Sequence, residues 1–204
     1  MRTVLVTAAV LTLTSAPALA QDSIRPVSRV AVFPIQHEML PAQVGVILSE
    51  RVAARLLERD RGVSVLGPTG VLARLVQPDI QDAWNRFLFT FTTTGIVDPV
   101  ELERVCEDLG ASALLDLELA DWVQREPTYA YGRRLLEALR VGLRAWWFGC
   151  SPPHLSWERW SEGISVAAPT DTATATPTTA SASAAAAAAV ETMLPLIPPV
   201  NRNR

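Results

Sequence analysis

Residues 98–122, DPVELERVCEDLGASALLDLELADW, carry the strongest structural signal in the chain and decide its fold. Asp98 is a good helix N-cap, and Pro99 suits the first position of a helix. Glu101, three residues after Asp98, is at the position of the acidic residue in a capping box. Because Gly110 supplies a C-terminal cap, the segment between these signals is predicted to be one helix.

Three segments after that helix predict β-strands. Residues 111–122 and 135–147 alternate between apolar and charged side chains, which is typical of an antiparallel strand with one covered face. Turn residues follow at 149–153, and residues 155–164 are predicted to return as a hairpin partner.

The first half of the chain predicts strands and helices in turn. Residues 29–35 are typical of a buried strand, and a helix is predicted from Pro41 to the residue before Gly62. Residues 63–66 predict a second strand, and residues 69–76 a short helix.

Residues 79–94 fit two patterns. Alternating phenylalanines favour a strand, whereas helical spacing of the apolar residues and Asp79 as an N-cap favour a helix. We expect a helix to about Phe89, followed by an irregular threonine-rich turn to Gly95.

Together these elements predict an α/β domain over residues 21–166, with a small mixed sheet flanked by helices, a C-terminal antiparallel hairpin and a final helix. Residues 167–183 contain Ala, Thr, Ser and Pro and predict a flexible linker. Residues 184–204 are expected to form the C-terminal helix and tail. The helical part, to about Leu194, either docks on the sheet or frays; we expect it to dock over apolar sheet surface.

The N-terminus predicts export. A basic residue, an apolar run and the small residues Ala18 and Ala20 have the order of a secretory signal, so residues 1–20 are expected to be removed after Ala20. No cysteine lies near the cleavage point, so we expect a soluble periplasmic protein and not a lipoprotein.

The charge of the chain argues against some partners. Its 204 residues include 18 basic residues, all of them arginine, and 21 acidic ones, for a net charge of −3. Without a basic cluster, nucleic acid and anionic lipid are not expected partners. No later segment reaches transmembrane length without charges or prolines, so none is expected in the mature chain.

The two cysteines have two interpretations. An oxidising compartment allows Cys106 and Cys150 to form a bridge. The pattern instead places Cys106 on the apolar face of a helix and Cys150 in a turn, so we expect both to be dispensable for the fold.

Catalytic and metal-binding motifs are weak. Cys150 and His154 have the spacing of half a zinc site, but neither His37 nor another residue clearly completes it, so no metal or cofactor is expected. Asp116 and Glu118 share a strand face and are a candidate acid pair. The alternative is that they pair across the sheet with Arg140 and Arg144.

Four tryptophans are the candidate partner surface: Trp146, Trp147, Trp157 and Trp160. The first two point to opposite faces of one predicted strand, and the others lie on its hairpin partner. Either the last helix covers one of these faces, or an aromatic patch binds a partner protein or a glycan.

Several segments resemble a family of bacterial envelope proteins, the superfamily of the TolB amino-terminal domain, CsgG and LpoB. Residues 29–34 are similar to its opening strand ending in proline, and residues 62–66 to its second strand. Residues 95–111 resemble its helix followed by an LGA strand, and residues 155–158 its returning strand. The resemblance covers residues 29–166. Many relatives are lipoproteins, and this chain lacks the lipid-attachment cysteine.

The resemblance implies a non-enzymatic periplasmic protein that binds an envelope protein or cell-wall glycan and assists assembly or transport. An exported hydrolase without a recognisable motif is the alternative. A pocket lined by convergent acids would favour the hydrolase, and a shallow apolar surface around the tryptophans would favour the binding protein.

Overall fold

The computed structural model describes residues 27–38, 40–125, 129–130, 133–134, 138–166 and 181–200. The expected signal peptide and most of the expected linker lie outside these residues. No helix within the described ranges has the length and hydropathy needed to cross a membrane.

The elements alternate as expected for an α/β chain. The strands are β1 (Arg29–Val32), β2 (Ser64–Leu66), β3 (Ala113–Arg125), β4 (Tyr129–Ala130), β5 (Arg133–Arg134), β6 (Ala138–Cys150) and β7 (Pro153–Val166). The helices are α1 (Ala42–Arg59), α2 (Pro68–Leu75), α3 (Pro78–Thr94), α4 (Pro99–Leu109) and α5 (Ala182–Met193), followed by the 3-10 turn η1 (Leu194–Leu196). The mixed sheet, the C-terminal hairpin and the final helix confirm the predicted fold class.

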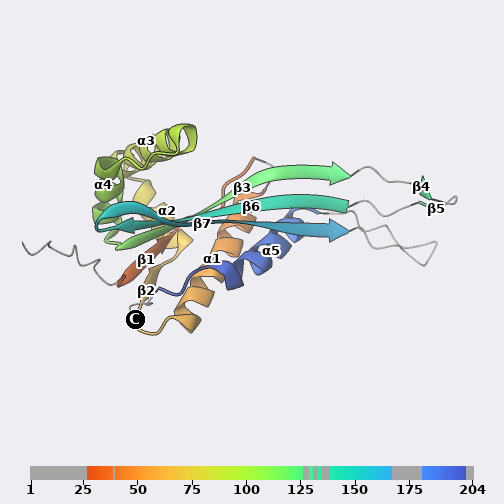
Figure 1. Ribbon diagram of the computed structural model, residues 1–204, viewed down its shortest axis with the longest axis horizontal. Helices are drawn as coiled ribbons and strands as arrows, with labels where there is room; N and C mark the ends of the chain where they lie inside the picture. The colour runs from red at the N-terminus through yellow and green to blue at the C-terminus, as the bar shows by residue number, and fades with distance from the viewer. Residues whose placement is uncertain are drawn as a thin grey trace, which may run out of the picture.

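The main sheet has the strand order β2-β1-β3-β6-β7, and β4 pairs separately with β5. β1 runs parallel to both β2 and β3, whereas β6 runs antiparallel to both β3 and β7. Parallel neighbours need crossover connections, which α1 provides on one face and α2 to α4 on the other. Figure 1 shows α3 and α4 over one end of the sheet and α1 and α5 on its opposite side.

Two hydrophobic cores lie on the two faces of the sheet because successive strand side chains point in opposite directions. On β3, Leu115 and Leu117 belong to the core under α1 and α5. Leu114 belongs to the core under α2, α3 and α4. The neighbouring residues Trp146 and Trp147 of β6 divide in the same way.

Helix α5 docks on the sheet, as expected. Its Ala-rich face is buried, and it packs mainly against β7 and β6. The packing is close at Gly163, where a Cβ atom would collide with the carbonyl oxygen of Ala185 and the backbone nitrogen of Ala189. Ser161 also donates a hydrogen bond to the carbonyl oxygen of Ala189 over 2.9 Å. The helix starts at Ala182 because Ser181 caps it.

The prediction that α3 ends near Phe89 was wrong. The helix continues to Thr94, where the backbone N–H of Gly95 donates to the carbonyl oxygen of Phe91. Phe91 is buried against the rings of Trp146 and Phe148. This burial outweighs the low helix propensity of the threonines, whose hydroxyls bond to carbonyl oxygens four residues earlier.

The ends of some other elements differ from the predictions. The N-cap of α3 is Gln77, with Pro78 in the first turn, so Asp79 is a first-turn acid and not the cap. β6 ends three residues later than predicted, because its pairing with β3 and β7 continues through the expected turn to Cys150. The predicted start of this strand, at residues 135–137, lies outside the described residues.

That continuation also overturns the expectation for the cysteines. Cys150 is the last residue of a strand, is buried, and forms a disulfide with Cys106 of α4. Its backbone N–H donates to the carbonyl oxygen of Ser112, which holds the end of β6 beside the start of β3 and under α4. The bridge therefore ties α4 to the hairpin of β6 and β7.

Candidate functional site

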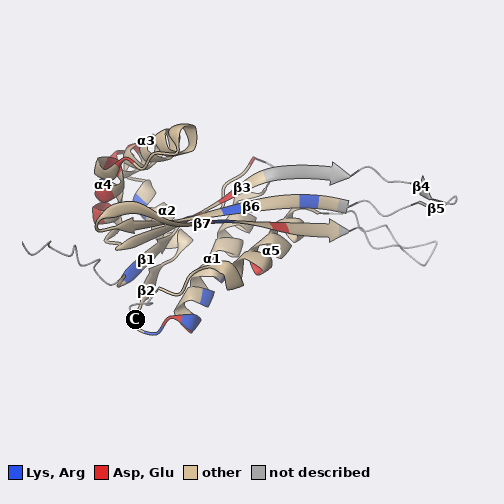
Figure 2. Ribbon diagram, in the orientation of Figure 1, with Lys and Arg blue, Asp and Glu red and all other residues tan. Residues whose placement is uncertain are grey.

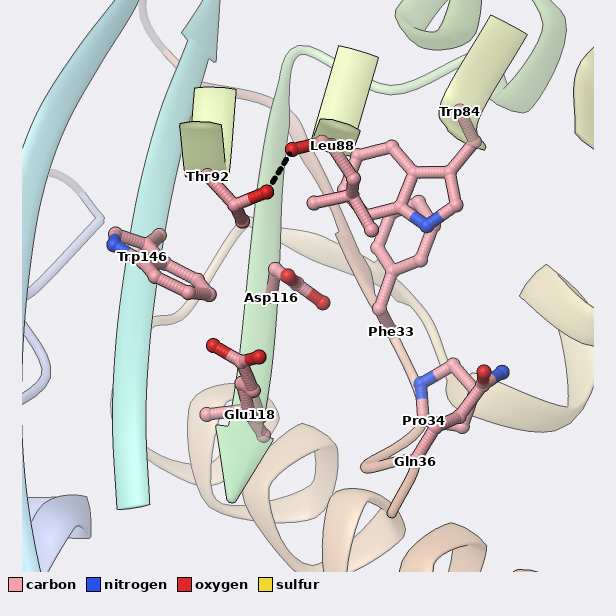
Figure 3. Close-up of a pocket in the computed structure, with 10 residues that line it drawn as sticks. Phe33, Pro34, Gln36, Trp84, Leu88, Thr92, Asp116, Glu118 and Trp146 are labelled. Carbon is pink, nitrogen blue, oxygen red and sulfur yellow. Dashed lines mark hydrogen bonds between the residues drawn. The ribbon is translucent and has the colours of Figure 1, made fainter. Parts of the chain in front are cut away.

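The first candidate region is a cavity of about 140 Å³ where β1 ends beside β3 (Figure 3). We call it the carboxylate pocket. It is lined by Phe33, Pro34, Gln36, Trp84, Leu88, Thr92, Asp116, Leu117, Glu118 and Trp146. In α/β sheets, ligands commonly bind outside the carboxyl ends of parallel strands, which is where this cavity lies.

The segment after β1 forms one wall of the pocket and is fixed from both sides. The backbone N–H of Ile35 donates to the buried hydroxyl of Ser49 on α1 over 2.9 Å. Gly45 of α1 packs so closely that a Cβ atom there would collide with the carbonyl oxygen of Ile35. On the other side, Gln36 forms a parallel β-bridge with Glu118. These contacts hold Gln36 next to the acids of β3.

Helix α3 forms another wall. Trp84, Leu88 and Thr92 follow one another at intervals of four residues and therefore share one helix face. The ring of Trp84 stacks on Phe33 with a centroid distance of 3.9 Å. Thr92 reaches the pocket only because α3 continues beyond Phe89.

Asp116 and Glu118 both point toward the pocket from β3 (Figure 3). Asp116 is only 8% exposed. Its burial, and then the negative charge of Glu118, raise the pKa of Asp116 to about 7, while the backbone N–H of Leu117 opposes that shift. The carboxyl group of Asp116 can therefore gain or lose a proton near neutral pH.

The expected pairing of these acids with arginines of β6 differs from the observed ion pairs. Arg140 contacts Glu162 at 3.3 Å and Arg144 contacts Glu158 at 3.7 Å, so both arginines pair with β7. Glu118 lies opposite Arg144 in the strand register, but the guanidinium group turns to the other neighbouring strand.

These ion pairs belong to the second candidate region, which we call the open face. It comprises Arg140, Arg144, Glu158, Trp160, Glu162 and Ile164 on β6 and β7. The strand register places them on the side of the sheet opposite α5. Figure 1 shows that this part of β6 and β7 extends beyond α3 and α4, and Figure 2 shows basic positions on β6 beside acidic positions on β7.

Trp160 and Ile164 are the apolar members of the open face. Trp160 is 37% exposed and Ile164 is 50% exposed. The indole of Trp160 lies over Gly142, where any Cβ atom would collide with it. The guanidinium carbon of Arg144 lies 5.6 Å from the centroid of this ring and 5.5 Å from that of Trp146. The exposed tryptophan is therefore held in a defined position.

The four tryptophans do not form one surface. Trp147 is buried in the core that includes α5, and Trp146 is buried under α3. Trp157 is partly buried against the α5 core. Trp160 alone of the four is an exposed residue, so the candidate partner surface needs correction to Trp160 and its neighbours.

The histidines and Cys150 do not form a zinc site in the structure. Cys150 is bonded to Cys106. The Nδ1 atom of His154 lies 2.6 Å from the carbonyl oxygen of Pro152, and its Nε2 atom lies 2.7 Å from the hydroxyl of Ser156. Because a carbonyl oxygen only accepts, Nδ1 donates and Nε2 accepts from Ser156 when the ring is neutral. No cluster of three or more His, Cys, Asp or Glu residues suited to a metal occurs in the described part of the chain.

Sequence reasoning missed the walls of the carboxylate pocket and the contact between Ser156 and His154. The contact between Ser156 and His154 could have been predicted from the sequence, because residues two positions apart on a strand point to the same face. The pocket walls come from the segment after β1, from α3 and from β6, which no local pattern brings together.

The comparisons with known proteins gave only weak similarities. No protein-family model matches the sequence, and no curated protein matches it significantly.

Among solved structures, the chain is similar to lipoprotein GNA1162 from Neisseria meningitidis, with 15% identity, a TM-score of 0.41, and coverage of 71% of this chain and 88% of that one. The hypothetical protein CT253 from Chlamydia trachomatis gives 15% identity and a TM-score of 0.39 over 68% and 73% of the two chains. A PelC dodecamer from Paraburkholderia phytofirmans gives 13% identity and a TM-score of 0.41 over 85% and 87%. Similarities this low carry no argument about function.

Proposed function

We propose that this chain is a non-enzymatic protein of the bacterial periplasm that binds another envelope protein and assists its assembly or transport. The observation that carries the proposal is the open face, where Trp160 and Ile164 are exposed beside ordered arginine–glutamate pairs.

The composition of the open face suits a protein partner. Tryptophan and arginine are the residues most enriched where binding energy concentrates in protein interfaces. The two arginines are matched by two glutamates, so the face offers a polar rim without a strong charge of either sign. A polyanionic partner would call for an excess of arginine, which this face lacks.

Two features support export. The first 20 residues have the order of a secretory signal, and the chain forms a disulfide, a bond that persists in oxidising compartments. Intact-mass analysis of the protein from its native host tests this part of the proposal. We expect a mature chain that begins at Gln21, and a cytoplasmic chain retaining Met1 or Arg2 would contradict it.

We also infer membership of the superfamily of the TolB amino-terminal domain, CsgG and LpoB. The inference rests on the segments quoted from residues 29–166. The observed order of strand, helix, strand, helices, hairpin and final helix is the order that the sequence predicted.

Photo-crosslinking from position 160 tests the binding function. A photoreactive benzophenone side chain replaces Trp160 in intact cells, and a matched probe replaces Phe89, which is 72% exposed on α3. We expect one defined protein adduct from position 160, lost when Ile164→Asp is added, and none from position 89. A carbohydrate adduct would show that the partner is a glycan and not a protein. Equal adducts from both positions would contradict specific binding at the open face.

A second candidate function, an exported hydrolase, is favoured by the carboxylate pocket. Asp116 has a pKa raised to about 7 beside the acid Glu118. A carboxyl group that can hold a proton near neutral pH beside a second carboxyl group is the arrangement used in general acid–base catalysis. Assays with glycoside, ester and peptide substrates should compare the protein with Asp116→Asn and with the open-face variant Glu162→Gln. Turnover that Asp116→Asn removes and Glu162→Gln preserves would establish the hydrolase and overturn the non-enzymatic proposal.

A further inference from the structure

The carboxylate pocket combines negative charge with aromatic walls. The rings of Phe33, Trp84 and Trp146 line the cavity together with the carboxyl groups of Asp116 and Glu118. Figure 3 shows the Asp116 carboxylate directed into the space between the aromatic side chains.

No basic side chain among the described lining residues balances the negative charge of the pocket. Among the described residues, its lining includes two acids and no arginine or histidine. Asp116 is more than nine-tenths buried, and the hydrogen bond that its carboxyl group accepts comes from the backbone of Leu117. No side chain among the described residues donates a hydrogen bond to it. Arg144, opposite Glu118 in register, instead contacts Glu158 and lies over the rings of Trp146 and Trp160. A buried carboxyl group of this kind is costly unless it is neutral or meets a cation.

We propose that the carboxylate pocket binds the alkylammonium group of an organic cation, with the ammonium against Asp116 and Glu118 and the alkyl stem along the aromatic rings. Ring faces attract a desolvated cation, and carboxylates form charge-assisted hydrogen bonds with its N–H groups.

The pocket suits an organic cation better than a metal ion. Calcium takes six to eight oxygen ligands, and magnesium needs octahedral oxygen coordination. The described residues of the lining offer two carboxylates, and the remaining surface that they form is largely aromatic and aliphatic. A cavity of about 140 Å³ accepts an ammonium head with a short stem, but not a large ligand.

This inference goes beyond the proposed function and does not depend on a partner at the open face. An alkylammonium group occurs both in free amines and in the lysine side chain. Both sources present the same chemistry to the pocket, so the experiment includes one probe for each.

The test is an NMR titration of the purified, disulfide-bonded protein at pH 8 and constant ionic strength. The indole N–H signals of Trp84 and Trp146, assigned with Trp84→Phe and Trp146→Phe, report binding. The probes are n-butylammonium, the Nα-acetyl amide of lysine, and n-butanol as the neutral analogue of similar length. We expect saturable shifts with n-butylammonium, and affinity lower by at least about tenfold for n-butanol and for Asp116→Asn.

Two further variants make the result specific. Glu118→Gln should also weaken binding of n-butylammonium, and Glu162→Gln on the open face should leave it unchanged. Binding of the lysine derivative as well would make a lysine side chain a ligand, and binding of n-butylammonium alone would restrict the site to small amines. Equal shifts with n-butanol, unchanged affinity in Asp116→Asn, or no saturable shift would overturn the proposal.

The affinity for n-butylammonium should rise from pH 6 to pH 8. The cation binds the ionised carboxyl group of Asp116, whose pKa is raised to about 7. The groups facing Asp116 are Glu118 on the same strand and the uncharged Trp84, Leu88 and Thr92 on α3, with Trp146 on β6. The nearest cation in the strand register, Arg144, faces Glu118 and pairs with Glu158.

Discussion

Asp116 lies on β3 with its carboxyl group inside the carboxylate pocket, and Glu118 adds a second negative charge two residues later. The unfolded chain exposes this carboxyl group to water, where its pKa returns to about 3.8. The folded protein therefore holds the proton more tightly than the unfolded chain does. Between about pH 4 and pH 7, the contribution of Asp116 to the free energy of unfolding therefore falls as the pH rises.

The substitution Asp116→Asn should remove this dependence, because an amide resembles the protonated acid and does not titrate. A shift of about three pKa units corresponds to about 4 kcal/mol. We expect the wild-type protein to lose up to about 4 kcal/mol relative to the variant between pH 4 and pH 8. Urea unfolding at both pH values measures the difference. Asp82→Asn, at an exposed position of α3, is the matched control, and its stability should depend on pH as that of the wild-type protein does. If the stability of Asp116→Asn also followed the wild-type dependence on pH, the burial of this charge would be contradicted.

The residues of the candidate site could be predicted only in part. The alternation of β3 identified Asp116 and Glu118 as a pair on one strand face. It did not show that one of them is buried, because the wall over Asp116 comes from α3, whose length the threonines obscured. Trp146 and Trp147 were predicted to point to opposite faces of one strand, but the cover of Trp146 by Phe91 depends on a contact between residues more than fifty positions apart.

At the scale of elements, the disulfide joins α4 to the end of β6. It closes a loop with a sequence separation of 44 residues, for which the chain-entropy model gives about 4 kcal/mol of stabilisation. We expect the double variant Cys106→Ala with Cys150→Ala to lose about this much in urea unfolding. Adding dithiothreitol should destabilise the wild-type protein by a similar amount and leave the double variant unchanged. Wild-type stability that does not respond to reduction would contradict the bridge.

The contact between α5 and β7 depends on the absence of a side chain at Gly163. Gly163→Val would collide with the backbone of α5 at Ala185 and Ala189, which cannot move without shifting the helix. We expect a loss of about 1–3 kcal/mol, typical of overpacking, and faster amide hydrogen exchange over residues 182–193. The control is Ile164→Val on the opposite, exposed side of the same strand, which should change neither quantity. Unchanged exchange in Gly163→Val would show that α5 is not held by this contact.

The elements were more predictable than their ends. Capping signals placed α4 correctly because Asp98 and Gly110 act locally. The end of β6 was missed because the turn-like sequence around Gly149 continues as a strand once β3 and β7 pair with it. The cysteine pair was missed for the same reason, since that continuation brings Cys150 under α4.

The whole molecule has a sheet with two different faces. One is covered by α1 and α5, while α2, α3 and α4 cover only one end of the other and leave β6 and β7 exposed at Trp160 and Ile164. The order of elements predicted a mixed sheet with a final helix. It did not predict which tryptophan would stay accessible, because that depends on how far α3 extends over the sheet.

We expect the open face to be occupied by a partner in the cell. Hydroxyl-radical footprinting compares oxidation of Trp160 in intact cells with that in the purified protein, and exposed Phe89 on α3 gives the internal control. We predict that Trp160 is protected in cells and oxidised in the purified protein, while Phe89 is oxidised equally in both. Equal oxidation of Trp160 in cells and in isolation would contradict the claim.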